Sequence, residues 1–154
     1  MADETTLRDL VERTRIAEVV NTLFVSTDAR IWPQVRSCFA PVVTFDMSSL
    51  AGGTAQPMSP EQIAAGWESG LAPIEQIHHQ TGNLSIKVKG EEAHASCYGI
   101  AYHFRDTLSG NNTRVFVGSY DFHLRLHDTG WLIDLFRYNL KFIDGNRDLE
   151  KEPV

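Results

Sequence analysis

The sequence has few of the features that would assign it at once to a familiar class. Its two cysteines, Cys38 and Cys97, are far apart and outside any CxxC pattern, which argues against a disulfide scaffold or a cysteine zinc site. No apolar run approaches the ~20 residues of a membrane span, and residues 1–9 are acidic and polar, unlike a signal peptide. We therefore expect buried cysteines, a cytoplasmic protein and no membrane partner.

Basic residues are also scarce. The chain has 14 Lys and Arg against 20 Asp and Glu, which gives a net charge of −6, and its basic residues form no cluster. A nucleic-acid partner would need such a cluster to meet the phosphate backbone, so we expect none. With 154 residues, 42% of them hydrophobic, the chain can form a single domain, with a core of about 7–144 and a polar tail of 145–154.

Helical patterns dominate the first half of the sequence. Apolar residues at spacings of three and four predict an amphipathic helix over residues 5–26. A second, shorter helix is predicted over residues 31–39, with Pro33 tolerated in its first turn. Ser59 is typical of the N-cap of a third helix, which Gly70 ends.

Strand patterns dominate the second half. A short strand over residues 42–47 comes first, and residues 48–57 have the composition of a loop. Four longer runs follow, over residues 77–88, 93–104, 113–126 and 131–140. Helices followed by a curved antiparallel sheet predict an α+β domain.

Two of these runs carry small and polar residues on alternate positions. If Phe104 pairs with Arg114 across the turn, the odd-numbered faces of both strands coincide. This face would leave a pocket that contains His103 and Asp121. Its members are Cys97, Gly99, Ala101, His103, Val117, Ser119 and Asp121.

The even-numbered positions of the same two runs are bulky. They would form an apolar outer face that a second subunit could cover, so we expect a homo-oligomer, either a dimer or a trimer. The residues of this expected face are Tyr98, Ile100, Tyr102, Phe116, Tyr120 and Phe122.

The patterns leave several roles open. His103 is either a pocket residue or a histidine satisfied within the core. Asp121 is either a pocket carboxylate or one half of a surface ion pair with Arg125 or Arg137. Asp28 is either a polar residue that ends the first helix or a catalytic residue.

His78 and His79 form an ambiguous pair. The apolar residues at 84, 86 and 88 have the parity of His78, whereas the polar residues at 81, 83 and 85 have the parity of His79. Period two alone does not decide which histidine faces the cavity, and Gly82 could mark a bulge that changes the phase.

The order and spacing of five short segments resemble scytalone dehydratase and, more broadly, the SnoaL-like branch of the nuclear transport factor 2-like superfamily. The resemblance covers about residues 7–144. The segments are Thr27-Asp28-Ala29-Arg30-Ile31-Trp32, Cys38-Phe39-Ala40-Pro41, Phe45-Asp46, Met58-Ser59-Pro60-Glu61 and His79-Gln80-Thr81-Gly82.

The resemblance implies a cone-shaped fold in which a bent antiparallel sheet wraps helices around a deep apolar cavity. It implies that Asp28, His79 and His103 are catalytic and that Ser119 binds substrate. It also places Asp121 where scytalone dehydratase has asparagine, and it decides the histidine pair in favour of His79.

The sequence departs from this family at two positions. The two tyrosines that hold a water against the substrate carbonyl in scytalone dehydratase are matched here by Thr27 and Met47. Another group must then polarise the carbonyl, and Tyr98, Tyr138 and Asp121 are the candidates. The expected substrate contacts are therefore Ser119, Tyr98, Tyr138, Thr27, Met47 and Asn83, with Asp121 as a second acid–base group.

These residues favour a dehydratase or isomerase that needs no cofactor and acts on a small apolar or aromatic hydroxy-ketone. Removing a proton beside a carbonyl needs a base such as histidine, and Asp28 would orient the His79 ring and stabilise its protonated form. One alternative is a module that binds a small molecule in the same cavity without chemistry. Another is a mononuclear metal centre formed by His79, His103 and Asp121.

Overall fold

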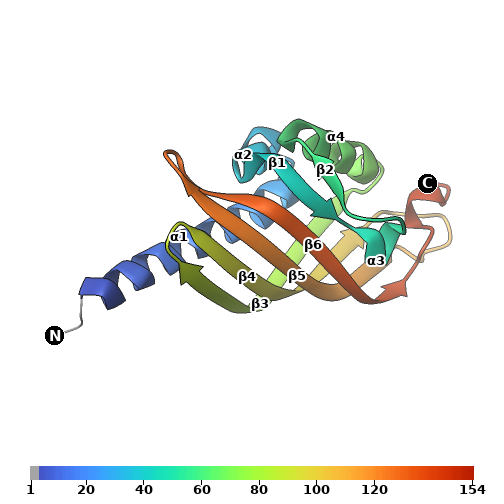
Figure 1. Ribbon diagram of the computed structural model, residues 1–154. Helices are drawn as coiled ribbons and strands as arrows, with labels where there is room; N and C mark the ends of the chain where they lie inside the picture. Colours follow the sequence, from blue (N-terminus) through green and yellow to red (C-terminus); the bar gives the residue numbers. More distant parts are fainter. Residues whose placement is uncertain (1–3) are drawn as a thin grey trace.

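A long helix and one curved sheet form the frame of the molecule (Figure 1). The computed structural model describes residues 4–154, and its first helix, α1, spans Glu4–Asp28. The next helix, α2 (Trp32–Ser37), has Pro33 in its first turn, where a missing N–H costs no helical hydrogen bond. Both helices confirm the predictions from apolar periodicity. Within residues 4–154, none of the helices combines the length and apolar character that a bilayer crossing requires.

The helix α4 (Pro60–Leu71) begins at a reciprocal cap. The Ser59 hydroxyl accepts the Gln62 N–H at 3.2 Å, and the Gln62 side chain accepts the Ser59 N–H at 2.9 Å. Such a capping box satisfies two N–H groups that the first turn leaves without partners.

The loop predicted over residues 48–57 is only partly a loop. A one-turn helix, α3 (Ser48–Ala51), forms because the Asp46 carboxylate accepts both the N–H and the hydroxyl of Ser48, at 3.0 and 2.6 Å. A short strand then begins at Gln56 and pairs with the strand before it. Short polar residues favour such local caps, and composition alone does not separate them from a loop.

Six strands form a single sheet in the order β2-β1-β6-β5-β4-β3. All neighbouring strands are antiparallel except β1 and β6, which run parallel. The prediction of a purely antiparallel sheet is therefore wrong at this one pair. The four long strands occur where the sequence predicts them. The bounds are β1 Phe39–Asp46, β2 Gln56–Met58, β3 Gln76–Lys89, β4 Glu92–Phe104, β5 Thr113–His127 and β6 Gly130–Gly145.

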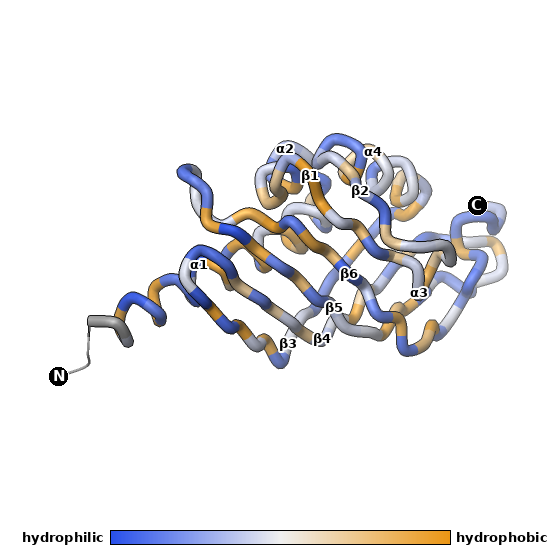
Figure 2. Tube along the Cα trace, viewed as in Figure 1, coloured by the Kyte–Doolittle hydropathy of each residue, from blue (hydrophilic) through white to orange (hydrophobic). Residues whose placement is uncertain are grey.

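The main core lies between α1 and the concave face of the sheet. Figure 1 shows α1 running behind the strands, while α2 and α4 cover one end of the sheet. Ile16 and Leu23 of α1 and Phe122 and Phe136 of the sheet are all 2% exposed or less. Along the strands, apolar and polar residues alternate (Figure 2), as expected when one face is buried and the other is solvated.

The pairing of β4 with β5 differs by one residue from the prediction. Phe104 pairs with Thr113 rather than with Arg114, so Gly99 lies opposite Gly118. A shift of one residue moves every side chain of one strand to the other face. The inner face therefore combines the odd-numbered residues of β4 with the even-numbered residues of β5.

The loop that joins β4 to β5 sets this register. The Arg105 N–H donates to the Asn112 carbonyl at 3.0 Å, which extends the ladder by one pair into the loop. The Asn112 side-chain oxygen also accepts the N–H and the hydroxyl of Thr107, at 3.0 and 2.9 Å. These contacts between turn residues are not visible in strand periodicity.

The small residues of β4 make room for aromatic rings of β5 rather than for an open pocket. A Cβ atom at Gly99 would lie only 2.2 Å from Cε2 of Tyr120. The outer face predicted for Phe116, Tyr120 and Phe122 is therefore wrong, because these three residues lie on the inner side with the core. Of the expected apolar outer face, Tyr98, Ile100 and Tyr102 remain.

A bulge in β3 explains the ambiguous parity of its histidines. The pairing with β4 shifts between Gly82 and Ser85, and Asn83 adopts a positive φ of 55° within the bulge. Before the bulge the odd-numbered Ile77 and His79 face inward, and after it the even-numbered Ile86 does. The phase change that Gly82 could mark is confirmed.

The C-terminal residues pack against the far end of the same sheet. Leu149, in a short 3-10 helix (Leu149–Lys151), is fully buried in a small cluster with Ile74 and Ile77. The Arg105 guanidinium donates to the Leu149 carbonyl at 3.0 Å. The polar tail thus contributes one buried apolar residue, Leu149, which packs against the domain.

Candidate active site

A cavity of about 240 Å³ lies between the helices and the inner face of the sheet. Its walls come from α1, α4, β3, β4, β5, β6 and the segment around α3. Apolar side chains dominate, and the polar groups are few, as in small-molecule sites. The lining residues are Phe24, Thr27, Met47, Leu50, Gly66, Trp67, Gly70, Leu71, His79, Ala101, His103, Phe116, Tyr120, Phe136 and Tyr138.

His79 is held in this cavity by Asp28. The ring Nδ1 donates to one oxygen of the Asp28 carboxylate at 2.6 Å, and the main-chain N–H of His79 donates to the other at 2.8 Å. Both carboxylate oxygens therefore bind the same residue, which fixes the position of β3 and the orientation of the ring together. Phe24 packs beside the imidazole with ring centroids 5.1 Å apart.

Asp28 occupies a position that its own helix disfavours. It is the last residue of α1, where the helix dipole repels a carboxylate, and the last turn has no basic residue. The nearby Arg30 has a positive φ of 57°, and its guanidinium donates to the carbonyls of Leu71, the last residue of α4, and of Ile74, which lies just after it. The turn after α1 is thus fastened to α4, so that Asp28 faces β3.

His103 is the second histidine of the cavity, and it is buried. The Arg114 guanidinium donates to its Nδ1 at 3.4 Å, while Arg114 is itself paired with Glu150 of the C-terminal segment. Burial and, after it, the positive charge of Arg114 lower the pKa of His103 to about 4. His103 is therefore neutral near pH 7.

These contacts give the two histidines opposite tautomers. Nδ1 of His79 donates to a carboxylate, so in the neutral ring Nε2 of His79 carries the lone pair. Nδ1 of His103 accepts from a guanidinium, so Nε2 of His103 carries the proton. One ring can thus accept a proton, and the other can donate a hydrogen bond.

Comparison with protein families and solved structures gives this arrangement a context. The family model described as the SnoaL-like domain matches residues 8–137. This match covers most of the chain. The chain belongs to the SnoaL-like family. No curated protein matches its sequence.

Solved structures share the fold of this SnoaL-like domain at low sequence identity. The Kfla4162 protein from Kribbella flavida is 16% identical, with 93% of this chain and 99% of that chain covered and a TM-score of 0.87. A candidate scytalone dehydratase from Novosphingobium aromaticivorans is 15% identical over 90% of both chains, with a TM-score of 0.76. A hexachlorocyclohexane dehydrochlorinase from Novosphingobium barchaimii is 13% identical over 92% of this chain and 94% of that chain, with a TM-score of 0.77. The expected α+β fold of the nuclear transport factor 2-like superfamily is confirmed.

Some of the predicted site residues do lie together in the SnoaL-like cavity. Thr27, Met47 and Tyr138 line it together with His79 and His103, and Asp28 holds His79 from behind. Thr27 is buried, and its hydroxyl donates to the Leu23 carbonyl at 2.7 Å. Their roles in binding or catalysis stay predictions.

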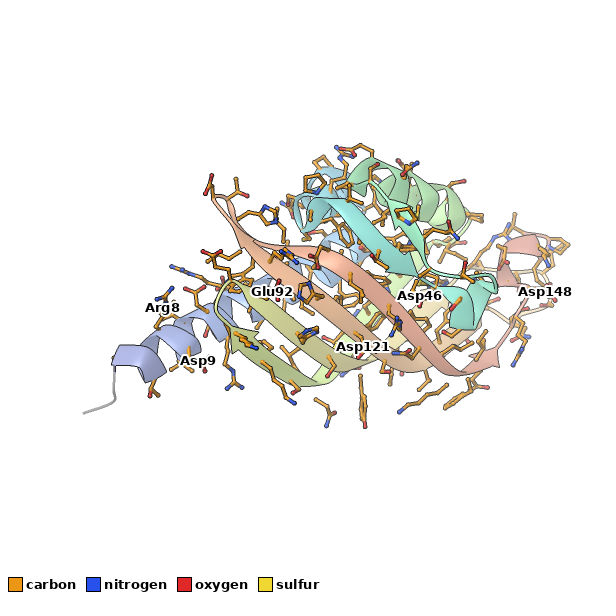
Figure 3. The ribbon with its side chains drawn as sticks, viewed as in Figure 1. Arg8, Asp9, Asp46, Glu92, Asp121 and Asp148 are labelled. Atoms are coloured by element: carbon orange, nitrogen blue, oxygen red, sulfur yellow. The ribbon has the colours of Figure 1, made fainter. Side chains whose placement is uncertain are left out.

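Other predicted residues lie outside the cavity. The register of β5 turns Asp121 and Ser119 to the outer face, where the Asn139 side chain donates to them at 2.8 and 3.3 Å. Figure 3 shows Asp121 on the open face of the sheet, with α1 behind it. Tyr98 is also on that face and 55% exposed, and Asn83 is exposed in the β3 bulge.

Asp121 also fails to meet either proposed charge partner. Arg137 pairs with Asp46 at 2.9 Å, and Arg125 pairs with Glu92 and Asp134 at 3.0 and 3.1 Å. The three expected metal ligands do not converge, because Asp121 and the two histidines lie on opposite faces. Nowhere in the described chain do three His, Cys, Asp or Glu side chains come together to hold a metal ion.

A second histidine–aspartate pair lies on the outer face. Nδ1 of His123 donates to Asp134 at 2.5 Å, and the other oxygen of Asp134 accepts from Arg125. Asp134 reaches His123 because the pairing of β5 with β6 shifts at this point and leaves Asp134 as the extra residue.

Sequence reasoning missed two groups of site residues. The aromatic lining of Phe116 and Tyr120 was assigned to the wrong face, and the correct register would have found it. The support of His103 by Arg114 and Glu150 was also missed. An arginine on the apolar parity of β5, with Phe116 and Phe122, is the signal that could have indicated a buried role for Arg114.

Proposed function

We propose that this SnoaL-like protein is a lyase or isomerase that uses His79 and Asp28 for general acid–base catalysis on a small cyclic hydroxy-ketone. The observation that carries the proposal is the double hydrogen bond of Asp28 to the ring and the main chain of His79. It leaves Nε2 of His79 as a proton acceptor at the wall of an apolar cavity. The pair supplies both the base and the conjugate acid that such a reaction needs.

Each residue has a separate part in the proposed reaction. Nε2 of His79 takes the proton from the carbon next to the substrate carbonyl, and Asp28 stabilises the imidazolium that forms. The C–H electron pair becomes the double bond of an enolate, and the carbonyl π pair moves to the oxygen. When the carbonyl re-forms, the β-hydroxyl leaves with the proton from His79 as water.

The cavity supports a substrate of one or two rings. An engineered cavity of roughly 150 Å³ accommodates benzene, and the cavity here has about 240 Å³. Its aromatic walls of Phe24, Trp67 and Phe136 suit a flat apolar ring, and its few polar groups suit one or two oxygens. The neighbouring solved structures named for elimination reactions are in line with this reaction class.

Proton abstraction can be tested before the substrate is known. Cyclic ketones and β-hydroxy cyclic ketones are incubated with the protein in D₂O, and loss of the α-proton signal is followed by NMR. Formation of a conjugated enone from the hydroxy-ketones is followed by absorbance. We expect the protein to accelerate exchange and His79→Ala to lose about 10²–10⁴-fold of that rate.

The matched control is His123→Ala, which removes the histidine of the outer pair. This variant should exchange protons at the wild-type rate. Full activity of a folded His79→Ala variant would overturn the assignment. A ligand that is bound and recovered unchanged, with no exchange across the ketone panel, would support the alternative of a binding module.

A further inference from the structure

The hydroxyl of Tyr138 is a buried donor whose own fold gives it no partner. Its side chain is 3% exposed and lines the cavity. Among the side chains that the structure describes, those of residues 6–154, the Tyr138 hydroxyl oxygen is one of two buried polar atoms that have no hydrogen-bond partner. Burying a hydroxyl without a partner opposes folding. A buried polar group without a partner is rare in folded proteins, and contact with a ligand is one explanation for the Tyr138 hydroxyl.

The position of this hydroxyl is fixed by rigid parts of the sheet. Tyr138 pairs with Tyr120 across β5 and β6, and their rings pack with centroids 4.9 Å apart. A Cβ atom at Gly118 would lie 2.7 Å from the Tyr138 hydroxyl and 2.8 Å from its ring. Gly118 therefore leaves the space in which the phenol lies.

Of the three candidates that the sequence offers for polarising the substrate carbonyl, only Tyr138 lines the cavity. Tyr98 and Asp121, the other two candidates, lie on the outer face of the sheet. Burial raises the pKa of Tyr138 to about 12, so its hydroxyl keeps its proton near pH 7 and acts as a donor. A fixed donor in an apolar site is suited to stabilise a developing oxyanion.

We infer that the Tyr138 hydroxyl donates a hydrogen bond to the carbonyl oxygen of the substrate and stabilises the enolate formed when His79 removes the α-proton. The inference rests on the proposed function and narrows its substrate class. The negative charge must develop on an oxygen, so the substrate is a carbonyl compound rather than a haloalkane, whose elimination releases halide and forms no oxyanion. The phenol proton stays on Tyr138 throughout the step.

An enolate mimic tests this contact without turnover. The probe is 4-nitrophenolate, a flat ring with an oxyanion, and the matched ligand is 4-nitrotoluene, which has the same outline without the charge. Wild type and Tyr138→Phe are titrated with both compounds above the pKa of the phenol. We expect Tyr138→Phe to bind 4-nitrophenolate about 10–100-fold more weakly and 4-nitrotoluene equally well.

Stability separates this role from a structural one. Phenylalanine keeps the ring and removes only the unpaired hydroxyl, so the thermal midpoint of Tyr138→Phe should equal or exceed that of wild type. The control is Tyr98→Phe, which removes an exposed hydroxyl from the outer face and should change neither affinity nor midpoint. A lower midpoint with weaker binding of both probes would assign Tyr138 to packing and overturn the inference.

The remaining outcomes are also decisive. If wild type does not bind 4-nitrophenolate, or binds it no better than Tyr138→Phe does, the inference is wrong. If Tyr138→Phe loses affinity for the phenolate while His79→Ala keeps full α-proton exchange, the oxyanion contact stands and the proposed function fails. If exchange depends on His79 but phenolate affinity ignores Tyr138, only the present inference fails.

Discussion

The two histidine–aspartate pairs of this molecule are almost identical as pairs. Nδ1 lies 2.6 Å from the carboxylate in His79–Asp28 and 2.5 Å in His123–Asp134. The side chains are 13% and 19% exposed in the first pair and 16% and 21% exposed in the second. Neither hydrogen-bond length nor accessibility separates them.

What surrounds each pair does separate them. The second oxygen of Asp28 accepts the main-chain N–H of His79, and the ring then faces an apolar cavity. The second oxygen of Asp134 accepts from Arg125, which also binds Glu92 in a network on the outer face. A histidine–carboxylate pair is therefore weak evidence for catalysis by itself, and the space in front of the ring decides its use.

The largest expected effect sharpens this comparison by changing one atom in each pair. Asp28→Asn keeps the shape but loses the charge that stabilises the imidazolium and the acceptor that fixes the tautomer of His79. We expect the rate of α-proton exchange, measured by NMR in D₂O, to fall about 10²–10⁴-fold.

Asp134→Asn is the same substitution in the outer pair and should exchange protons at the wild-type rate. An equal loss in both variants would mean that the pairs do not differ in the way their surroundings indicate.

The next largest effect is the dependence of the free energy of unfolding on pH, which comes from the buried His103. His103 has a pKa of about 4 in the folded protein, against 6.5 for an ordinary histidine. Between these values the unfolded chain binds a proton that the folded protein does not, so stability is complete above about pH 6.5 and is lost as the pH falls towards 4. The slope is about 1.4 kcal/mol per pH unit, and the total is about 3 kcal/mol.

Urea unfolding between pH 7 and pH 4.5 measures this loss. In His103→Gln the part of the slope that comes from His103 should disappear, because no proton can bind at that position. The same substitution at the exposed His94 of the outer face is the control, and the part of the slope that comes from His103 should remain in that variant. An unchanged slope in His103→Gln would show that His103 does not exclude the proton.

The smallest effect compares two glycines of the sheet. At Gly99 on the inner face, an added Cβ would collide with the Tyr120 ring at 2.2 Å, and overpacking of this kind costs about 1–3 kcal/mol. At Gly82 on the edge strand, nothing lies within 4 Å of an added Cβ. We expect Gly99→Ala to lower the free energy of unfolding, and Gly82→Ala to leave it unchanged or raise it by about 0.4–1 kcal/mol.

Denaturant unfolding of both variants at pH 7 provides the measurement. Equal free energies of unfolding for the two variants would contradict the interpretation that the small residues of β4 leave space for the aromatic rings of β5.

Local patterns predicted most of the architecture. The long strands and the three main helices occur where periodicity and capping residues place them, because each pattern depends on residues within one turn or one strand. The ambiguity of His78 and His79 was also correctly traced to Gly82, since a glycine in a strand signals a bulge. The family resemblance indicated Asp28 and His79, and both strand parity and the resemblance indicated His103.

The misplacement of Asp121 and Ser119 has one physical source. Period two tells which residues of a strand share a face, but it does not tell which face of the next strand joins them. The hydrogen bond from Arg105 to Asn112 fixes a β4–β5 pairing that differs by one residue from the predicted one. Asp121 and Ser119 therefore lie on the outer face and not in the cavity. This hydrogen bond joins two loop residues that belong to no helix or strand pattern, and it determines on which face Asp121 and Ser119 lie.

The sequence by itself determined the order of elements, the faces within each strand and the residue types available for acid–base chemistry, because these follow from neighbours along the chain. Only the tertiary structure decided which faces meet and which nitrogen of each histidine holds the proton. It also decided which of two matching histidine–aspartate pairs faces a cavity. These properties depend on hydrogen bonds and packing between residues far apart in the chain, such as Asp28 and His79, and no local pattern records them.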